Sequence, residues 1–295
     1  MTEYQIYTLP NGIRVAHRQV AHTKIVHCGI MLDIGSRDEQ PHQSGLVHFW
    51  EHMAFKGTKK RKSYHIINRL ESVGGELNAY TTKEKVCFYA SALDIHFDKT
   101  VELLTDITFN SVFPENQIEK ERGVILEEMS MYEDSPEDAI QDEFDEYVFS
   151  DHQLGMNILG TREHVKSFTK KDLQEFIAQN MDTSKIVISI VGNIPLKKAV
   201  RRVEKYVSDI PFKTIDYKRV KPPEFQVRHV NLEKQTVQAH CALGRRSLSI
   251  KDNNRLALFT LINLMGGPGM NSRFNLSLRE KYGLVYGIDA NFTSY

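Results

Sequence analysis

The stretch LVHFWEHMAFK, residues 46–56, places three polar side chains within an otherwise almost wholly apolar segment. A helix of this composition would be apolar nearly all round, which is typical of a helix buried in a protein core. His48 and His52 are four residues apart, so on a helix they lie one above the other, with Glu51 beside them. An unpaired charge in a core is costly, and these polar groups must therefore be hydrogen-bonded or bound to a ligand.

The order His-x-x-Glu-His is the inverse of the commoner His-Glu-x-x-His zinc signature. Two neutral imidazoles can bind Zn²⁺, and a carboxylate beside them can accept a proton from a water molecule at the metal. The alternative is a core helix whose polar groups are satisfied by the backbone or by water. The pentapeptide alone leaves both interpretations open.

The composition excludes some classes of protein. With 295 residues, the chain is long enough for one large or two medium domains. Lys+Arg and Asp+Glu both number 38, and this balance argues against a nucleic-acid partner. No stretch approaches the roughly 18 apolar residues of a membrane span, and the first residues do not have the pattern of a leader peptide. We therefore expect no membrane association and a cytoplasmic location.

The three cysteines, Cys28, Cys87 and Cys241, are widely spaced and odd in number. They do not form the pattern of a disulfide framework or of a paired-cysteine metal site. All three lie in apolar runs typical of strands, so we expect buried free thiols in a reducing compartment.

Hydrophobic periodicity predicts the secondary structure of the first two thirds of the chain. Period-2 or continuous apolar runs predict strands over residues 4–9, 13–20, 24–34, 76–82, 85–93 and 185–192. Helical spacing predicts helices over residues 45–56, 63–73, 98–112, 114–134, 136–149, 169–180 and 196–208. The long helix that begins after Pro114 is expected to break at Ser135-Pro136, because proline cannot continue a helix.

Residues 209–226 contain Pro211, Pro222 and Pro223 among basic residues and are predicted to be a linker between domains. After this linker the pattern restarts, with strands expected over 227–232 and 236–243 and helices over 252–265 and 271–281. We therefore predict an N-terminal domain over 1–208 and the first part of a second domain over 227–295.

The second domain is predicted to be a related copy of the first. His27-Cys28 recurs as His240-Cys241, a shift of 213 residues. Under this shift His48, Glu51 and His52 correspond to Leu261, Leu264 and Met265, so the second copy would lack metal ligands. It has only residues 227–295, and residues 292–295 are expected to form a strand without a partner. We therefore expect a truncated second copy.

A zinc site needs a third protein ligand and an open position for water. Residues Glu121, Val124, Ile125, Glu128 and Tyr132 follow helical spacing and form one stripe. Glu128 and Glu121 occupy a stripe where apolar residues are expected. Glu128 would gain most by binding the metal, and Glu121 could accept a hydrogen bond from a ligand imidazole. The alternative is an acidic helix exposed to solvent.

Four phrases carry a resemblance that covers essentially the whole chain: HFWEHMAFKGT at 48–58, GGELNAYTTKE at 74–84, ERGVILEEM at 121–129 and LREKYGLVYG at 278–287. In this order they resemble the pitrilysin and mitochondrial-processing-peptidase family of zinc peptidases, the inverzincins. The resemblance implies that His48, His52 and Glu128 bind one Zn²⁺ per chain. It also implies that Glu51 is the general base and that Glu121 supports the site.

The resemblance further implies an α+β fold, in which each half is a mixed β-sheet with helices packed on one face. Two related halves would enclose a chamber that admits short or unfolded peptides. Asn78-Ala79-Tyr80 would be the edge strand that pairs with the substrate backbone. An Arg and a Tyr seven residues apart in the second half contact substrate in this family, and Arg279 and Tyr286 match that pattern. Without the resemblance, both could be ordinary surface or packing residues.

The function expected from these observations is a zinc-dependent endopeptidase. The main alternative is a non-catalytic or weakly active partner subunit of a two-chain peptidase, and a homodimer or a related partner chain is possible in either case. S-ribosylhomocysteine lyase also uses a His-x-x-Glu-His pair, but its third ligand is a cysteine and its chain is much shorter. A purely scaffolding repeat domain is the remaining alternative.

Overall fold

The computed structural model describes residues 4–293. The chain divides into two compact units, the first ending at Ala242 and the second beginning at Leu243. Of the final strand expected over 292–295, Ser294 and Tyr295 lie outside the described residues, and Phe292 and Thr293 are not part of a strand.

One six-stranded sheet organises the first unit, in the order β1-β2-β6-β3-β5-β4. β2 and β6 are parallel, and the other neighbours are antiparallel, so the sheet is mixed as expected. The strands are β1 (Gln5–Thr8), β2 (Arg14–Gln19), β3 (Ile25–Leu32), β4 (Glu76–Thr81), β5 (Val86–Leu93) and β6 (Ile186–Gly192). β6 follows β5 after about a third of the chain, yet it lies between β2 and β3 in the middle of the sheet.

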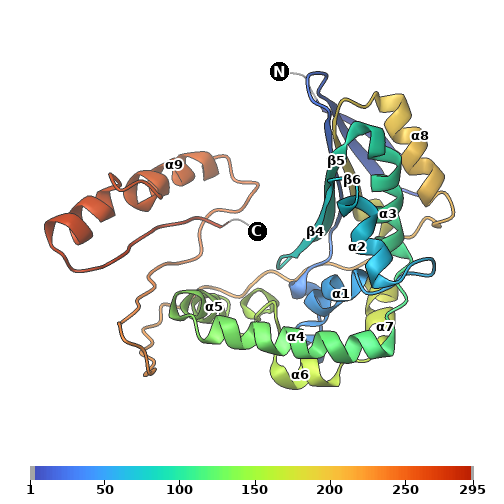
Figure 1. The fold of residues 1–295 in the computed structure, drawn as a ribbon. Coiled ribbons are helices and arrows are strands. Elements are labelled where there is room, and N and C mark those ends of the chain that lie inside the picture. The colour runs from blue at the N-terminus through green and yellow to red at the C-terminus, as the bar shows by residue number, and fades with distance from the viewer. Residues whose placement is uncertain (1–3, 294–295) are drawn as a thin grey trace. The chain divides into compact units, whose positions relative to one another are not determined.

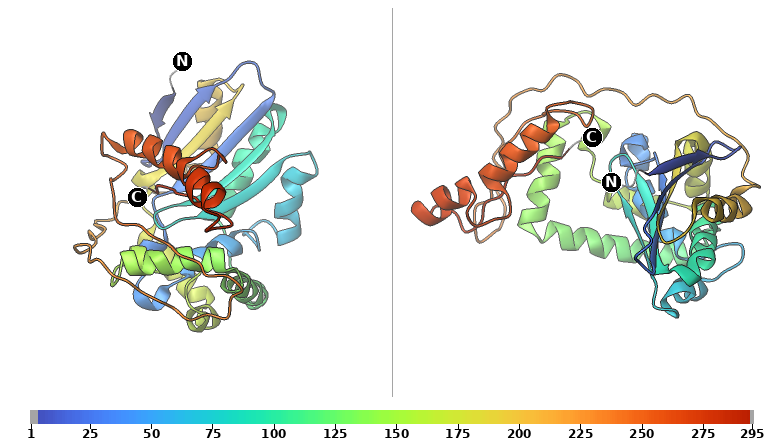
Figure 2. Two further views of the ribbon diagram at one scale, coloured as in Figure 1. Left: turned by 90° about the vertical axis from the view of Figure 1, so that its left-hand side faces the viewer. Right: turned by 90° about the horizontal axis from the view of Figure 1, so that it is seen from above.

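Helices cover one face and one end of this sheet. Figure 1 shows α3 and α8 on a single side of the sheet, with α1 between the end of the sheet and the long helix α4. The views in Figure 2 agree with this arrangement. The helices are α1 (Leu46–Ala54), α2 (Ser63–Glu71), α3 (Phe97–Phe109), α4 (Glu115–Glu133), α5 (Pro136–Val148), α6 (Arg162–Ser167), α7 (Lys170–Asn180) and α8 (Leu196–Val207). The predicted α+β class, with helices packed on one face, is confirmed.

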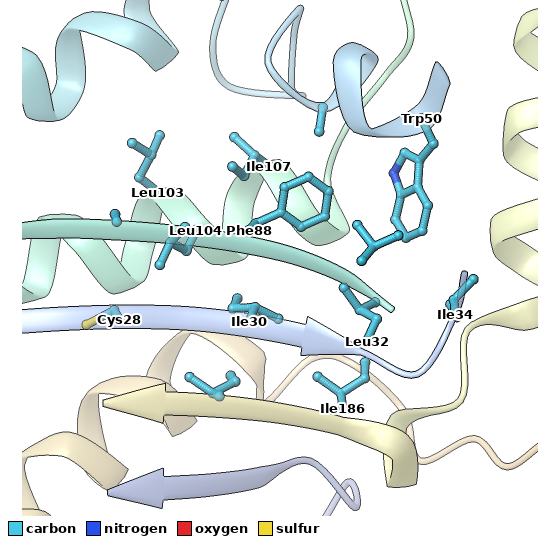
Figure 3. Close-up of a cluster of buried hydrophobic side chains, with 14 of the residues drawn as sticks. Cys28, Ile30, Leu32, Ile34, Trp50, Phe88, Leu103, Leu104, Ile107 and Ile186 are labelled. Carbon is cyan, nitrogen blue, oxygen red and sulfur yellow. The ribbon is translucent and has the colours of Figure 1, made fainter. Parts of the chain in front are cut away.

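Strand alternation explains why helices cover only one face. Along β3, Cys28, Ile30 and Leu32 are at most 3 % exposed and point toward the helices, whereas Ile25 at the start of the strand is 46 % exposed. Figure 3 shows these residues in one cluster with Phe88 of β5, Trp50 of α1 and residues of α3. The rings of Trp50 and Phe88 are 5.9 Å apart at their centroids, so the core contacts α1 directly.

The start of α1 depends on a glycine. Gly45 precedes the helix with φ of +96°, a left-handed conformation that other residues rarely adopt. A Cβ atom at this position would lie 2.4 Å from the carbonyl oxygen of Leu159. The close approach of the 159–160 segment therefore leaves room only for glycine directly before the helix that carries His48.

The later part of the chain departs from the sequence prediction. It contains α9 (Arg255–Gly266) and a π-helical segment, Asn275–Lys281, but the strands expected over 227–232 and 236–243 are absent, and that prediction was wrong. A strand is stabilised by ladder hydrogen bonds to a neighbour. Within the described residues neither segment has such a neighbour, and their apolar side chains, including Val227 and Val237, are exposed.

Cys28 and Cys87 are buried free thiols, as expected, but Cys241 is exposed, and the prediction for that residue was wrong. Its burial was predicted from a strand that does not form. Within residues 4–293, no helix combines the length and the apolar character needed to cross a lipid bilayer.

The packing of Phe88 against α1 predicts a large loss of stability on truncation. Phe88 is fully buried, so Phe88→Ala removes buried area and leaves a cavity, which typically costs about 3–5 kcal/mol. Tyr89 lies next to it on the open face and is 36 % exposed, so Tyr89→Ala should cost less than about 1 kcal/mol. Urea unfolding followed by the fluorescence of Trp50, the single tryptophan, measures both. Equal losses for the two variants would contradict the described core.

Candidate metal centre

The site lies where α1 packs against α4. His48 and His52 project from one face of α1, and Glu128 projects toward them from the middle of α4. One carboxylate oxygen, Oε2 of Glu128, lies 3.8 Å from Nε2 of His48 and 3.5 Å from Nε2 of His52. The three donor atoms are within 4.8 Å of one another. The sequence prediction named these three residues as metal ligands, and the structure brings them together.

These separations suit metal ligands better than hydrogen-bond partners. A contact of 3.8 Å is too long for a hydrogen bond. Ligand atoms at about 2.0–2.1 Å from a tetrahedral zinc ion are about 3.3 Å apart, close to the spacing found here. Two imidazole nitrogens and one carboxylate are also the donor set of catalytic zinc sites, in which a fourth position stays open. His48, His52 and Glu128 therefore fit zinc by both chemistry and spacing.

A second carboxylate orients His52. Nδ1 of His52 lies 3.3 Å from Oε2 of Glu121, and the other oxygen of Glu121 lies 2.6 Å from Nζ of Lys56. Glu121 is only 6 % exposed, so its charge is shielded from water. A hydrogen bond to the far nitrogen of a ligand imidazole fixes both its orientation and its tautomer. By contrast, Nδ1 of His48 is buried and has no hydrogen-bond partner within the described part of the chain.

The sequence analysis missed Lys56 and Thr81, which contact the two glutamates beside the ligands. Lys56 lies two residues after the end of α1, where its ammonium group pairs with Glu121 of α4. Thr81, at the end of β4, donates its hydroxyl hydrogen bond to Oε2 of Glu51. No local pattern relates Thr81 to Glu51, because the two lie on a strand and a helix that meet only in the folded chain.

The surroundings of His48 and His52 shift the pKa values of the two imidazoles in opposite directions. Burial, together with the charge of His52, lowers the pKa of His48 to about 4. Burial also opposes the charged form of His52, but the hydrogen bond to Glu121 and the nearby carboxylate of Glu128 outweigh burial and raise the pKa to about 9. The proximity of His52 lowers the pKa of the Glu128 carboxyl. Burial raises the pKa of Glu51, despite the hydrogen bond from Thr81.

The expected substrate strand lies at the edge of the sheet. β4 pairs only with β5, and Asn78, Ala79 and Tyr80 lie in its middle. Asn78 and Tyr80 are exposed on the open face, and Tyr80 is 6.0 Å from the ring of Tyr89. The strand therefore has a free edge within the described residues and ends at Thr81, which contacts Glu51.

Arg279 and Tyr286, the two substrate-contacting residues expected from the second half, belong to the second unit. Arg279 lies in the π-helical segment and pairs with Glu280 at 3.8 Å, and Tyr286 is 85 % exposed. Their roles remain predictions.

Comparison with known proteins identifies the family. Residues 14–162 match the family described as Insulinase (Peptidase family M16), and residues 167–295 match the description Peptidase M16 inactive domain. The chain is 35 % identical to an uncharacterized zinc protease of Bacillus subtilis, YmxG, over 98 % of this chain and 70 % of that protein. The chain therefore belongs to the M16 family of peptidases.

Two further relatives extend this result. The chain is 34 % identical to a probable mitochondrial-processing peptidase subunit beta of Arabidopsis thaliana, over 91 % of this chain and 51 % of that protein. The crystal structure of a protease from Helicobacter pylori has the same fold, with a TM-score of 0.83 and 21 % identity over all of this chain and 72 % of that one. All three relatives are longer than this chain.

The unequal protonation of the two imidazoles predicts proton release on zinc binding. At pH 7 in the metal-free chain, His52 is protonated because its pKa is about 9, and His48 is neutral because its pKa is about 4. Ligand imidazoles must be unprotonated, so binding should release about one proton. Calorimetric titration with zinc in buffers of different ionisation enthalpy measures this number.

The matched variant for this prediction is Glu121→Gln. It replaces the Glu121 carboxylate, which raises the pKa of His52, by a neutral amide, so less than one proton should be released. Release of no proton by the parent chain would contradict the described electrostatics.

Proposed function

We propose that this chain provides the metal-binding half of a zinc endopeptidase that hydrolyses peptide bonds in short or unfolded peptides. The observation that carries this proposal is the convergence of His48, His52 and Glu128, with Glu51 between the two histidines on the same helix. Zinc protease names among the relatives support the same chemistry. We further propose one zinc ion per chain.

When bound, zinc acts as a Lewis acid that polarises a peptide carbonyl and makes a water molecule acidic near pH 7. We assign Glu51 as the base that would accept a proton from the attacking water and return it to the leaving amine nitrogen. Burial raises the pKa of Glu51, and a base whose pKa approaches the working pH transfers protons in both directions efficiently. The hydroxyl of Thr81 holds the carboxylate in one orientation.

The free edge of β4 supports a mode of substrate binding. An extended peptide can add to this edge through main-chain hydrogen bonds, with Asn78, Ala79 and Tyr80 as its partners. Such pairing recognises backbone rather than side chains, and it therefore suits unfolded substrates. We assign Tyr286 as a second hydrogen-bond donor to the developing oxyanion and Arg279 as a substrate anchor, following the family pattern.

A second candidate function is a non-catalytic or weakly active partner subunit, either in a homodimer or beside a related chain. The match of residues 167–295 to an inactive-domain description favours it, since that part contributes none of the three proposed ligands. The intact set of His48, Glu51, His52 and Glu128 favours the catalytic proposal. Hydrolysis of a fluorogenic peptide by the zinc-loaded chain, abolished by a chelator, would distinguish the two functions.

Removal of the proposed base should separate metal binding from catalysis. Glu51→Gln keeps the size of the side chain but cannot accept a proton, so turnover should fall by about 10²–10⁴-fold. Zinc content, measured by elemental analysis, should stay at the parental value because Glu51 is not a ligand. Near-parental turnover by this variant would refute the role of Glu51.

Three glutamates on α4 allow a graded test of the metal centre. Glu128→Gln should weaken zinc binding by more than about 100-fold, because it removes a ligand. Glu121→Gln removes only the carboxylate that contacts His52 and should weaken zinc binding by about 10–100-fold. Glu127→Gln, at an exposed position next to Glu128, should leave zinc binding unchanged. Competition with a chromophoric chelator measures all three, and equal effects at positions 127 and 128 would exclude the proposed ligand set.

A further inference from the structure

The segment 209–226 has neither helix nor strand, yet within the first unit it is hydrogen-bonded at several points to residues that precede it in the chain. The carbonyl of Lys213 accepts a hydrogen bond from the amide of Thr183 at 2.9 Å, and the amide of Ile215 donates to Asp182 at 3.0 Å. Further along, the carbonyl of Val220 accepts a hydrogen bond from the guanidinium of Arg37 at 2.9 Å. Residues 213–220 are therefore held in place against the preceding part of the first unit.

Arg219 makes the densest of these contacts. Its Nε and Nη2 donate to the two carboxylate oxygens of Asp38 at 2.8 and 2.7 Å, a bidentate pair. Its Nη1 donates to Asp33 at 2.7 Å, and its Nη2 reaches the carbonyl of Glu84 at 3.0 Å. Isolated ion pairs on a protein surface contribute little to the stability of the fold. This one is bidentate and Asp38 is only 7 % exposed, so the pair is charge-assisted and shielded from water.

The two segments that Arg219 contacts are themselves joined. Asp33 and Asp38 belong to the loop between β3 and α1, and Glu84 belongs to the turn between β4 and β5. The amides of Ser36 and Arg37 donate to the carbonyls of residues 82 and 83 at 3.2 and 2.9 Å. Arg219 therefore lies at a junction where three segments far apart in sequence are joined by hydrogen bonds: the loop between β3 and α1, the turn between β4 and β5, and its own segment.

One residue beside this junction connects it to α1, the helix that carries His48 and His52. Glu39 follows Asp38 and is 1 % exposed. Its carboxylate accepts hydrogen bonds from the amides of Gly45 at 3.0 Å and Val47 at 2.7 Å. These amides are at the start of α1, where helix N–H groups have no partner within the helix. Val47 directly precedes His48, so the carboxylate of Glu39 fixes the turn from which the first ligand projects.

The same junction is also connected to the proposed base, Glu51. The turn that contains Glu84 follows β4, whose last residue, Thr81, holds Glu51 by a hydrogen bond. Arg219 thus contacts the two segments that carry Glu39 and Thr81, the residues hydrogen-bonded to the start of α1 and to Glu51, although Arg219 itself lies after α8 in the sequence.

We propose that Arg219 is a positioning residue of the metal centre, through which the segment after α8 holds the 33–39 loop and the start of α1 in place. The link to metal binding rests on the proposed function, whereas the link to the start of α1 rests on the contacts alone. Glu39, Gly45 and Val47 are the groups through which it acts.

The first measurement is hydrogen exchange of the metal-free chain, followed by mass spectrometry. In Arg219→Ala, amides in the peptide covering residues 44–50 should exchange at least about tenfold faster than in the parent, because local opening becomes easier. Peptides from α3 should be unchanged. Lys218→Ala, an exposed neighbouring charge, is the matched control and should behave like the parent.

The second measurement is the zinc dissociation constant, by competition with a chromophoric chelator. Arg219→Ala should weaken binding by about tenfold, at the lower end of the range for groups that support ligands from outside. Arg219→Lys keeps the charge but cannot form the bidentate pair, so its effect should be intermediate. If Arg219→Ala does not fold, Arg219→Lys carries both measurements.

The outcomes distinguish the claims. Unchanged exchange over residues 44–50 in the Arg219 variants would overturn the proposal. Faster exchange with zinc affinity within twofold of the parent would reduce Arg219 to a structural anchor and would also overturn it. A parent chain that binds no zinc would contradict the proposed function, while exchange would still decide whether Arg219 fixes the start of α1.

Discussion

The structure depends on one constraint: α1 is buried almost completely, yet it carries two histidines and a glutamate on one face. The apolar residues around them fill the core beneath the sheet, where Trp50 and Phe88 are fully buried. The polar face must therefore find partners within the protein, because uncompensated polar groups in a core are costly. α4 supplies them as Glu121 and Glu128. Two helices joined by polar groups at an otherwise apolar contact form a site that a divalent cation can complete.

Other parts of the first unit hold α1 and the groups around it in place. Gly45 lets the 159–160 segment approach the start of α1, Glu39 accepts hydrogen bonds from its first amides, and β4 ends beside Glu51. Within the described residues of the first unit, the sheet leaves one face without helices and leaves β4, at one of its two edges, without a second partner. The proposed metal ligands, the proposed base and the end of β4 therefore lie together in the first unit.

Much of this arrangement follows from local sequence pattern. Helical spacing located α1 and α4, and Pro136 marked the break before α5, because each depends on residues close in the chain. The stripe containing Glu121 and Glu128 pointed to α4 as the partner of α1. Contacts such as Thr81 with Glu51, or Arg219 with Asp38, join distant segments, and no local period encodes them. The two strands expected after residue 226 failed for a related reason: alternation describes a strand only where another strand lies beside it.

The most direct test of the account is X-ray absorption at the zinc edge of the metal-loaded chain, measured for the parent and for Glu128→Gln. The account predicts two imidazole nitrogens and a carboxylate oxygen around zinc, no sulfur neighbour, and loss of the bound metal in the variant. A sulfur ligand, or a coordination shell that is the same in both proteins, would contradict it.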